Sequence, residues 1–320
     1  MPAGLLIDLN DGGPRMEITS GLRCPTFSGQ WTAASTSVSL DMANYVPGSE
    51  VILLPRVCAG YAPPVSPSII PAVGVLTGFT QNGATVTQTY WTSLGDKLVR
   101  GFDASVWQIL PASASAGGGL LIQDSTDFMS IAVNSMAGFC VWRGSVTFTG
   151  TWALPDTIAP KSNYVVFGKW SHPSATVECD GTVVTAFEDR NGEDVPATVT
   201  ITIAIFASGI APTPGPGLNF FKNGACVFST TNRPFIYNRA VWTPSWSWTD
   251  IGDTMIMLGV YGYDSNTNGG WDYMKLAGIV RSGNAVRCGR GRVRWRWTDR
   301  YALVGQRLTN IPVPCIPAMY

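Results

Sequence analysis

Charge is scarce in this chain, and its scarcity limits what the protein can do. Only 13% of the 320 residues are charged, about half the share of an ordinary soluble protein. So few charges are typical of a chain whose surface is covered by contacts with other subunits. The 21 basic and 21 acidic residues also cancel, and a neutral protein tends to associate. We therefore expect a protein that works inside an assembly.

Histidine is nearly absent and the common catalytic motifs are missing, which argues against an enzyme. The single histidine, His172, stands beside Pro173, and one histidine cannot supply the ligand pair of an HExxH site. The chain has no GxSxG elbow and no GxxxxGKS or GxxxxGKT phosphate loop. We expect no enzymatic activity and no cofactor. A glycosidase that uses the acids of segment 188–194 is a distant alternative, because paired carboxylates can be far apart in sequence.

Metal ligands are also too few to predict a metal site. Residues 264–269 match the first half of a calcium loop, but Lys275 replaces the closing glutamate. We expect a plain turn there. The seven cysteines are scattered and form no CxxC, so buried reduced thiols are expected rather than disulfides or zinc ligands.

Long apolar runs and a basic leader are missing, which argues against secretion and membrane insertion. The longest apolar candidate, segment 200–206, is far shorter than a membrane span and is typical of a strand. The first residues carry no basic region and reach Asp8 at once, unlike a signal peptide. We expect a protein made in the cytosol, without membrane insertion.

A repeated hairpin pattern is present instead. A glycine-led apolar stretch, a polar turn and a second apolar stretch occur three times, and each copy predicts a β-hairpin. The three copies span residues 4–18, 119–131 and 217–229.

The repeats and the turn-rich composition predict an all-β fold of three tandem antiparallel β-sandwich-like domains. Thirty-five glycines and 22 prolines interrupt most windows, and no useful amphipathic helix is apparent. Two Gly/Pro/Ser/Ala-rich stretches, 111–119 and 211–217, are typical of linkers. The predicted domains are 1–118, 119–216 and 217–320. Further strands are expected at 51–54, 105–110, 164–167, 198–206, 255–260 and 301–304.

Charge is unevenly divided among these units. The first unit has a net charge of −2, the second of −5 and the third of +7. The acidic second unit and the basic third unit could complement each other within one chain or between subunits, or the division could be chance.

The third unit holds an arginine-rich segment and most of the candidate contact residues. Side chains alternate across a strand, so we expect Arg290, Arg292, Arg294 and Arg296 to share one face, with Trp295 and Trp297 on the core side. Their partner could be an acidic subunit surface, an anionic sugar or, least favoured, nucleic acid; the plainest interpretation is a charged surface strand. Candidate contact tryptophans are Trp246 and Trp248, expected on one face, and Trp271.

The openings of the first and third units resemble small proteins encoded in the tail gene clusters of tailed bacteriophages. The resemblance rests on segment 4–19 and on segment 217–229, followed by Arg233 and Pro234. The second unit resembles them less, because its turn 124–127 lacks the family's glycine. The resemblance implies a virion location at the tail tip, the baseplate or the base of a fibre, and it implies no catalytic residues.

Two functions follow from these observations. The first is a structural component of the phage tail that contacts other phage tail proteins and forms a homo-oligomer, of which a trimer is one form. The second is a receptor-binding module whose third unit recognises a glycan or protein of the host surface. No nucleic-acid partner is expected, because the chain is neutral and has no nucleic-acid-binding motif.

Overall fold

The protein is all-β. The computed structural model describes residues 4–10, 12–19, 21–32, 35, 37–64, 68–96, 102–111, 113, 119–124, 127–132, 137–298 and 305–320. Within these ranges the strands are interrupted by two named single-turn 3-10 helices, Lys161–Asn163 and Thr230–Asn232. No helix of the described residues has the length and apolar character needed to cross a bilayer.

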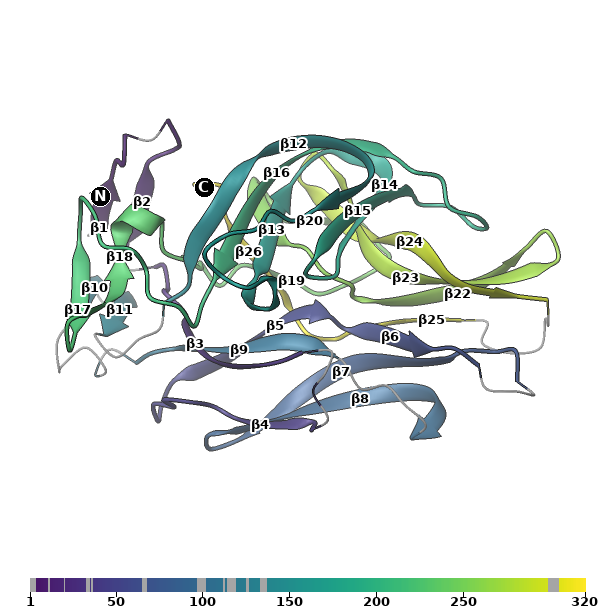
Figure 1. Cartoon of the computed structure of the whole chain (residues 1–320), viewed down its shortest axis with the longest axis horizontal. Coiled ribbons are helices and arrows are strands. Elements are labelled where there is room, and N and C mark those ends of the chain that lie inside the picture. The colour runs from purple at the N-terminus through teal and green to yellow at the C-terminus, as the bar shows by residue number, and fades with distance from the viewer. Residues whose placement is uncertain are drawn as a thin grey trace.

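The first segment of the chain builds two small antiparallel sheets, which lie together along one side of the molecule (Figure 1). The first sheet has the order β3-β9-β5 and the second β4-β8-β7-β6. Their strands are β3 (Thr26–Trp31), β4 (Ser39–Asp41), β5 (Glu50–Val57), β6 (Ala59–Ala62), β7 (Ala72–Asn82), β8 (Thr85–Asp96) and β9 (Asp103–Ile109). The strands predicted at 51–54 and 105–110 are thereby confirmed.

The second and third segments share one large, curled sheet of 13 strands, which covers the two small sheets (Figure 1). From the second segment come β12 (Phe139–Ala153), β13 (Val165–Lys169), β14 (His172–Cys179), β15 (Val183–Glu188) and β16 (Thr198–Ala207). From the third come β19 (Val241–Trp242), β20 (Thr249–Asp250), β21 (Thr254–Met257), β22 (Gly262–Asn268), β23 (Trp271–Ser282), β24 (Ala285–Trp297), β25 (Gly305–Leu308) and β26 (Val313–Pro317).

The two segments are joined by strand pairing rather than by simple contact. Strand β13 pairs with β21, and β14 pairs with β23, both antiparallel. The all-β prediction is confirmed, whereas three tandem sandwiches are not, because these ladders combine strands of two predicted units. The closing strand predicted at 301–304 lies outside the described residues.

Three isolated hairpins complete the fold. They are β1 (Gly4–Ile7) with β2 (Met16–Thr19), β10 (Gly119–Asp124) with β11 (Asp127–Ala132), and β17 (Asn219–Lys222) with β18 (Ala225–Ser229). All three predicted hairpins are confirmed. They gather at one end of the long axis, away from β22, β23 and β24 (Figure 1). The third turns on Asn223 and Gly224, whose φ values of 51° and 81° match the mirror-image turn that favours Asn-Gly.

Strand β16 illustrates why the sequence forms a half-buried sheet. Its isoleucines, including Ile201 and Ile203, are fully buried, and each buried side chain of this size contributes about 1.5–3 kcal/mol. The alternating threonines face outward, where the Thr198 and Thr200 hydroxyls hydrogen-bond across to Thr149 and Thr147 at 2.7 and 2.8 Å. The period of two in hydrophobicity therefore becomes one apolar and one polar face.

One hydrophobic cluster contains buried residues from all three predicted units, among them Trp107, Phe206 and Trp242. A buried arginine reinforces this connection. Arg56 on β5 pairs with Asp103 and donates to the carbonyl of Ser162 in the second segment at 2.5 Å. The first segment is thus bound to the second by packing and by a desolvated cation.

All seven cysteines are free thiols, and six of them are buried. Burial raises the pKa of the Cys24 and Cys179 thiols to about 12. They fill the core as small apolar side chains, as the sequence predicts.

Candidate functional site

The three hairpins repeat in register as well as in sequence. In each, the apolar residue near the start of the first strand faces an apolar residue of the second strand. The equivalent pairs are Leu5 with Ile18, Leu120 with Ile131 and Phe220 with Phe228. Each copy of the motif therefore forms an antiparallel hairpin, although the loop between β1 and β2 is longer than the other two and a bulge interrupts the third hairpin between Phe220 and Phe221.

The first and third hairpins also have an outward position next to this pair. Leu6 and Phe221 hold it in the first and third hairpins, and their side chains are 61% and 53% exposed. The inward partners Ile18 and Phe228 are almost completely buried. Leu121 holds the corresponding position in the sequence of the second hairpin. The first and third hairpins thus carry an apolar residue where the fold itself does not bury it.

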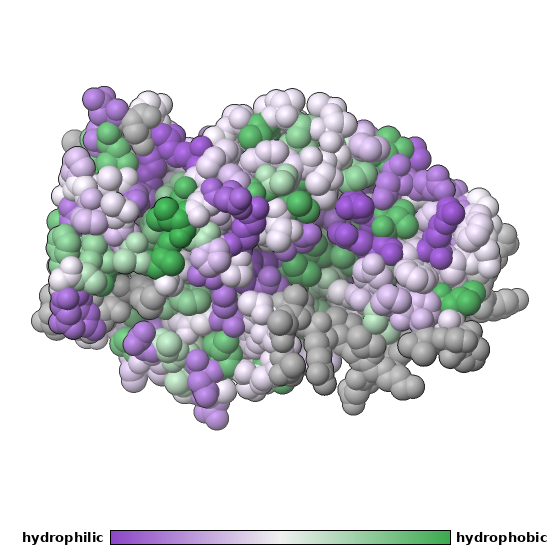
Figure 2. Space-filling view, viewed as in Figure 1, coloured by the Kyte–Doolittle hydropathy of each residue, from purple (hydrophilic) through white to green (hydrophobic). Residues whose placement is uncertain are grey.

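These outward residues lie where the three hairpins gather. Figure 2 shows hydrophobic residues reaching the surface at this end of the molecule. Exposed apolar side chains scattered singly are ordinary, whereas repeated ones on adjacent elements are typical of an interaction surface. We call Leu6, Phe221 and their three hairpins the hairpin end.

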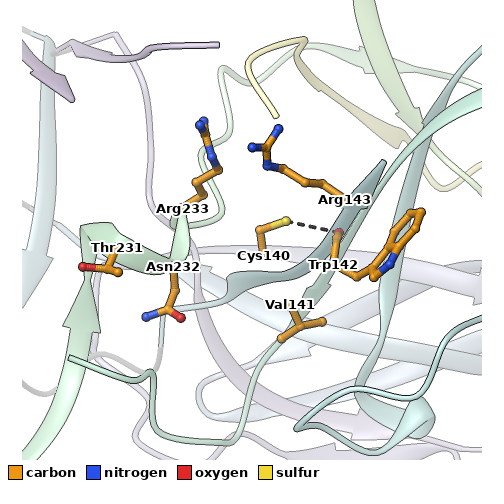
Figure 3. A pocket seen from close by; sticks show the side chains of 7 residues that line it. All are labelled: Cys140, Val141, Trp142, Arg143, Thr231, Asn232 and Arg233. Carbon is orange, nitrogen blue, oxygen red and sulfur yellow. Dashed lines mark hydrogen bonds between the residues drawn. The ribbon is translucent and has the colours of Figure 1, made fainter. Parts of the chain in front are cut away.

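The first hairpin is fastened to the body through two arginines that line a cavity of about 280 Å³ (Figure 3). Arg233 donates to the carbonyl oxygens of Pro14 and Met319 at 2.8 and 3.1 Å. Arg143 lies so close to the β1–β2 loop that a Cβ at Gly13 would overlap its guanidinium. The two arginines therefore hold the loop in place. The absence of a side chain at Gly13 makes room for the guanidinium of Arg143. The other lining residues are Cys140, Val141, Trp142, Thr231 and Asn232.

The arginine-rich segment, residues 290–297, forms most of strand β24, which lies away from the hairpin end. Three of its arginines form ion pairs with acids of the same chain. Arg290 donates to Asp264 at 2.7 Å, Arg294 to Glu178 at 3.0 Å and Arg296 to Glu193 at 2.8 Å. The Arg292 guanidinium lies 5.5 Å from the centre of the Phe187 ring. The acidic and basic units therefore complement each other within one chain. A contact of these arginines with another subunit stays a prediction.

The strict alternation expected along this segment was wrong in part. Register shifts interrupt the β23–β24 ladder on both sides of Lys275, and such bulges turn side chains out of simple alternation. As a result Gly291 and Arg294 both lie against Glu178, and a Cβ at Gly291 would overlap the carboxylate. Trp297 is buried as expected, whereas Trp295 is half-buried and donates to the carbonyl of Ile69 at 3.3 Å.

The three candidate tryptophans are not equivalent. Residues 243–248 form no strand, so Trp246 and Trp248 do not share a face by alternation. Trp246 packs partly buried against the core, whereas Trp248 is 46% exposed with the Arg287 guanidinium 5.0 Å from its ring centre. Trp271 is 39% exposed, and Arg296 lies 4.8 Å from its ring centre. Two exposed tryptophan–arginine pairs result.

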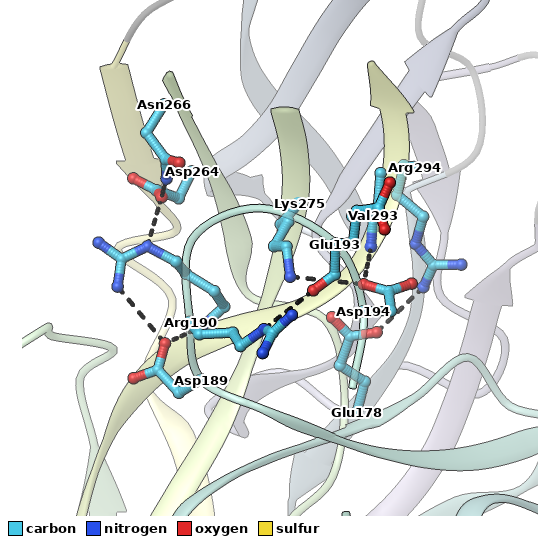
Figure 4. A network of polar contacts seen from close by, with 11 residues as sticks. Glu178, Asp189, Arg190, Glu193, Asp194, Asp264, Asn266, Lys275, Val293 and Arg294 are labelled. Carbon is cyan, nitrogen blue, oxygen red and sulfur yellow. Dashed lines mark hydrogen bonds and ion pairs between the residues drawn. The ribbon is translucent and has the colours of Figure 1, made fainter. Parts of the chain in front are cut away.

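A network of charged side chains joins the loop after β15 to strands β22, β23 and β24 (Figure 4). It includes two buried charged residues that no sequence motif assigned to a site, Glu178 and Lys275, which are 2% and 1% exposed. Both interrupt apolar strands, and that interruption is the signal that could have found them. The acids of segment 188–194 enter this network, with Asp189, Glu193 and Asp194 each ion-paired.

A separate groove opens between the first and third segments. Its volume is about 390 Å³, within the range of small-ligand pockets. Arg239 and Glu50 form an ion pair of 2.5 Å at the groove, and burial raises the pKa of Tyr237 to about 12. The lining residues are Glu50, Val51, Ile52, Leu53, Phe79, Tyr237, Arg239, Val241, Ile311, Pro312 and Pro314. No sequence motif pointed to this groove, because its walls come from four distant segments.

These features describe an all-β protein with an apolar, repeated hairpin end and a body held together by buried charges. Residues 4–299 match the model of a family of unknown function, DUF6453, and the chain belongs to that family. No curated protein and no solved structure matches the chain.

Proposed function

We propose that the protein is a structural component of a bacteriophage tail, at the tail tip, the baseplate or the base of a fibre. It acts by protein–protein contact and catalyses no reaction. The observation that carries the proposal is the hairpin end, where three copies of one motif lie together and expose Leu6 and Phe221. The resemblance of segments 4–19 and 217–229 to proteins of phage tail gene clusters supports the location.

The internal pairing of charges supports the choice of the hairpin end over strand β24 as the main contact surface. The arginines of β24 have acidic partners in their own chain, so association at β24 would have to replace bonds already made. The hairpin end offers apolar surface, whose burial contributes about 25 cal/mol per Å² before the cost of ordering.

Light scattering over a concentration series tests the association. We expect a defined homo-oligomer, of which a trimer is one form, that dissociates in the double variant Leu6→Ser, Phe221→Ser. Ile158→Ser is the matched control, because Ile158 is 67% exposed and lies outside the three hairpins. A wild-type monomer at every concentration would contradict self-assembly and favour docking onto tail proteins made by other genes.

Labelled electron microscopy tests the location. An antibody against this chain is expected to mark the distal tail of particles whose genome encodes it. Particles that carry no label and no peptide of this chain would contradict a virion role.

A receptor-binding role is the second candidate, and the exposed pairs Trp248–Arg287 and Trp271–Arg296 favour it. Flat aromatic rings beside arginine are typical of surfaces that bind proteins, and flat rings also suit sugars. If this role holds, Trp271→Ala abolishes binding to host cells while the oligomeric state is unchanged. Binding that survives Trp248→Ala and Trp271→Ala together would exclude this surface.

We also propose that the chain consists of three hairpin-led units, 1–118, 119–216 and 217–320, each of which contributes one hairpin to the same end. The finer interpretation as three separate sandwiches is testable by limited proteolysis at 112–118 and 211–217. Independent sandwiches would separate after cleavage, whereas units joined by the β13–β21 and β14–β23 ladders would stay associated under native conditions.

A further inference from the structure

A lysine whose amine makes few hydrogen bonds is buried inside the charged network. Lys275 on β23 is 1% exposed, and its Nζ lies 3.4 Å from Oδ1 of Asp194 in the loop after β15. That distance is long for a charge-assisted hydrogen bond, which usually measures about 2.7–2.9 Å. Within the described part of the chain this is the one hydrogen bond that the three donors of Nζ make.

The surroundings of Lys275 disfavour its charged form relative to that of a lysine in water, and the neutral amine is the nucleophilic form. Burial lowers the pKa of Lys275 below its usual value, and the positive charge of Arg190 acts in the same direction. Asp194 and Glu178 oppose this shift with their negative charges, but the net direction is downward. A desolvated lysine of this kind can attack a carbonyl carbon.

The carboxyl group of Asp194 is held for such an attack. Its Oδ1 accepts the backbone N–H of Val293 at 2.8 Å, so a fixed donor polarises the carbonyl that Lys275 faces. Nζ is 3.4 Å from Oδ1, the oxygen bonded to the Cγ atom that it would attack. The Asp194 side chain is 26% exposed, which leaves a path for a released water molecule.

A buried acid stands beside the pair. Glu178 is 2% exposed, its Oε2 accepts from Arg294 at 3.0 Å, and its Oε1 has no hydrogen-bond partner in the described structure. Burial raises the pKa of Glu178, although Arg294 and Arg292 oppose the shift. Its charge acts on both Asp194 and Lys275, and the three side chains lie together in Figure 4. No hydrogen bond joins Glu178 to Nζ of Lys275 or to Asp194 in the described structure, so Glu178 can exchange a proton with the pair only through a bridging water molecule.

We propose that Lys275 and Asp194 join through an intramolecular amide bond, with Glu178 as the proton carrier. Within the ion pair, Lys275 first gives a proton to Asp194, which leaves a neutral amine beside a protonated carboxyl group. The Nζ lone pair of Lys275 then forms a bond to Cγ of Asp194, and the bond from Cγ to its hydroxyl oxygen breaks. Through the bridging water molecule, Glu178 takes one proton from Nζ and delivers a proton to the departing oxygen, which leaves as water. No electrons are exchanged with a redox partner, and no cofactor takes part.

The bond would tie β23 to the β15–β16 loop and thus join the second and third predicted units covalently. The two residues are 81 positions apart, so the cross-link would restrict a long loop of the unfolded chain. This inference does not depend on where the protein acts, and its failure would leave the proposed tail function untouched.

Intact-mass measurement of the purified full chain tests the proposal. We expect a mass lower than that of the sequence by one water molecule, and a tryptic digest that contains Lys275 and Asp194 in one branched peptide. Lys275→Met restores the full mass. Asp194→Asn keeps the branched peptide but releases ammonia instead of water, because the amide nitrogen becomes the leaving group.

Two comparisons sharpen the test. Lys169 and Asp253 also form an ion pair, but they are 35% and 70% exposed, and the digest should contain no branched peptide from them. Glu178→Gln should fold and retain the full mass, because a glutamine side chain cannot carry the proton. A wild-type chain of full mass after prolonged incubation at neutral pH would overturn the proposal. Complete loss of water in Glu178→Gln would overturn the role of Glu178.

Discussion

The two ends of the molecule differ in the kind of side chain that they leave without a partner in this chain. At the β24 end, arginines and acids from distant segments are buried or half-buried in mutual contact, as in the pair of Arg294 with Glu178. At the hairpin end, three two-stranded sheets stand apart from the larger sheets, and Leu6 and Phe221 face outward. At the first end Arg290, Arg294 and Arg296 pair with acids of the same chain, whereas the second end retains apolar surface that this chain does not cover. The arginine-rich part of β24, the most conspicuous charged segment of the sequence, is therefore part of the internal framework.

We expect the largest loss of unfolding free energy from a substitution on the inner face of a hairpin. Phe228 is 2% exposed and stacks on Phe220 with ring centres 5.2 Å apart. Phe228→Ala should therefore cost about 3–5 kcal/mol through lost burial and a cavity. Phe221→Ala, on the outer face of the same hairpin, should change stability by less than about 0.5 kcal/mol. Urea unfolding followed by tryptophan fluorescence measures both, and equal costs would contradict the assignment of faces.

Removing the half-buried arginine that pairs with a buried acid should have the next largest effect. Arg294→Ala leaves the 2%-exposed Glu178 without its bonded cation, and breaking a buried pair in this way costs about 3 kcal/mol or more. Arg296→Ala on the same strand breaks an exposed pair with Glu193 and should cost about 0.2–1 kcal/mol. Urea midpoints give the two values. A similar small cost for both variants would mean that the β24 network does not stabilise the body.

The pH dependence of stability should reveal the buried pair of Arg56 and Asp103. Burial raises the pKa of Asp103 above 3.8, although Arg56 opposes the shift. The folded state therefore binds this proton more tightly than the unfolded state, and the stabilisation is full below pH 3.8 and declines as the pH rises through the folded-state pKa. The unfolding free energy of Asp103→Asn should lack this decline. A decline of the same slope in wild type and variant, measured by urea titration from about pH 4 to about pH 7, would contradict the direction of the shift.

The smallest effect is expected on thiol reactivity. Burial raises the pKa of the Cys58 and Cys315 thiols to about 12, and a thiol reacts as its thiolate. A thiol reagent at about pH 8 should thus modify none of the six buried cysteines rapidly in the folded protein and all seven cysteines in urea. Rapid labelling of a buried cysteine in the folded chain would show that the core opens.

Much of the local structure follows from short sequence patterns. The hairpins were predictable because a glycine-led apolar strand, a polar turn and a second apolar strand are complete within about 15 residues. Strands such as β9 and β16 were predictable for the same reason, since alternation of side chains is a property of one strand.

The pairing of strands from the second predicted unit with strands from the third could not be predicted from these patterns. The ladder between β13 and β21 joins Phe167 to Met257, and nothing near either residue specifies a partner so far away. The bulges around Lys275 similarly depend on how β23 and β24 meet, and they changed which residues face Glu178. Trp246 and Trp248 were misplaced because a pattern of alternation was applied to a segment that forms no strand.

The sequence by itself determined the all-β class, the three hairpins and the excess of arginine in the third segment, because backbone preference, turn chemistry and composition are local properties. Only the tertiary structure decided that the hairpins meet at one end, that Arg290, Arg294 and Arg296 find acids within the chain, and that Lys275, Asp194 and Glu178 lie together. These arrangements depend on which strands pair across distant parts of the chain, and that pairing is set by the burial of one shared core.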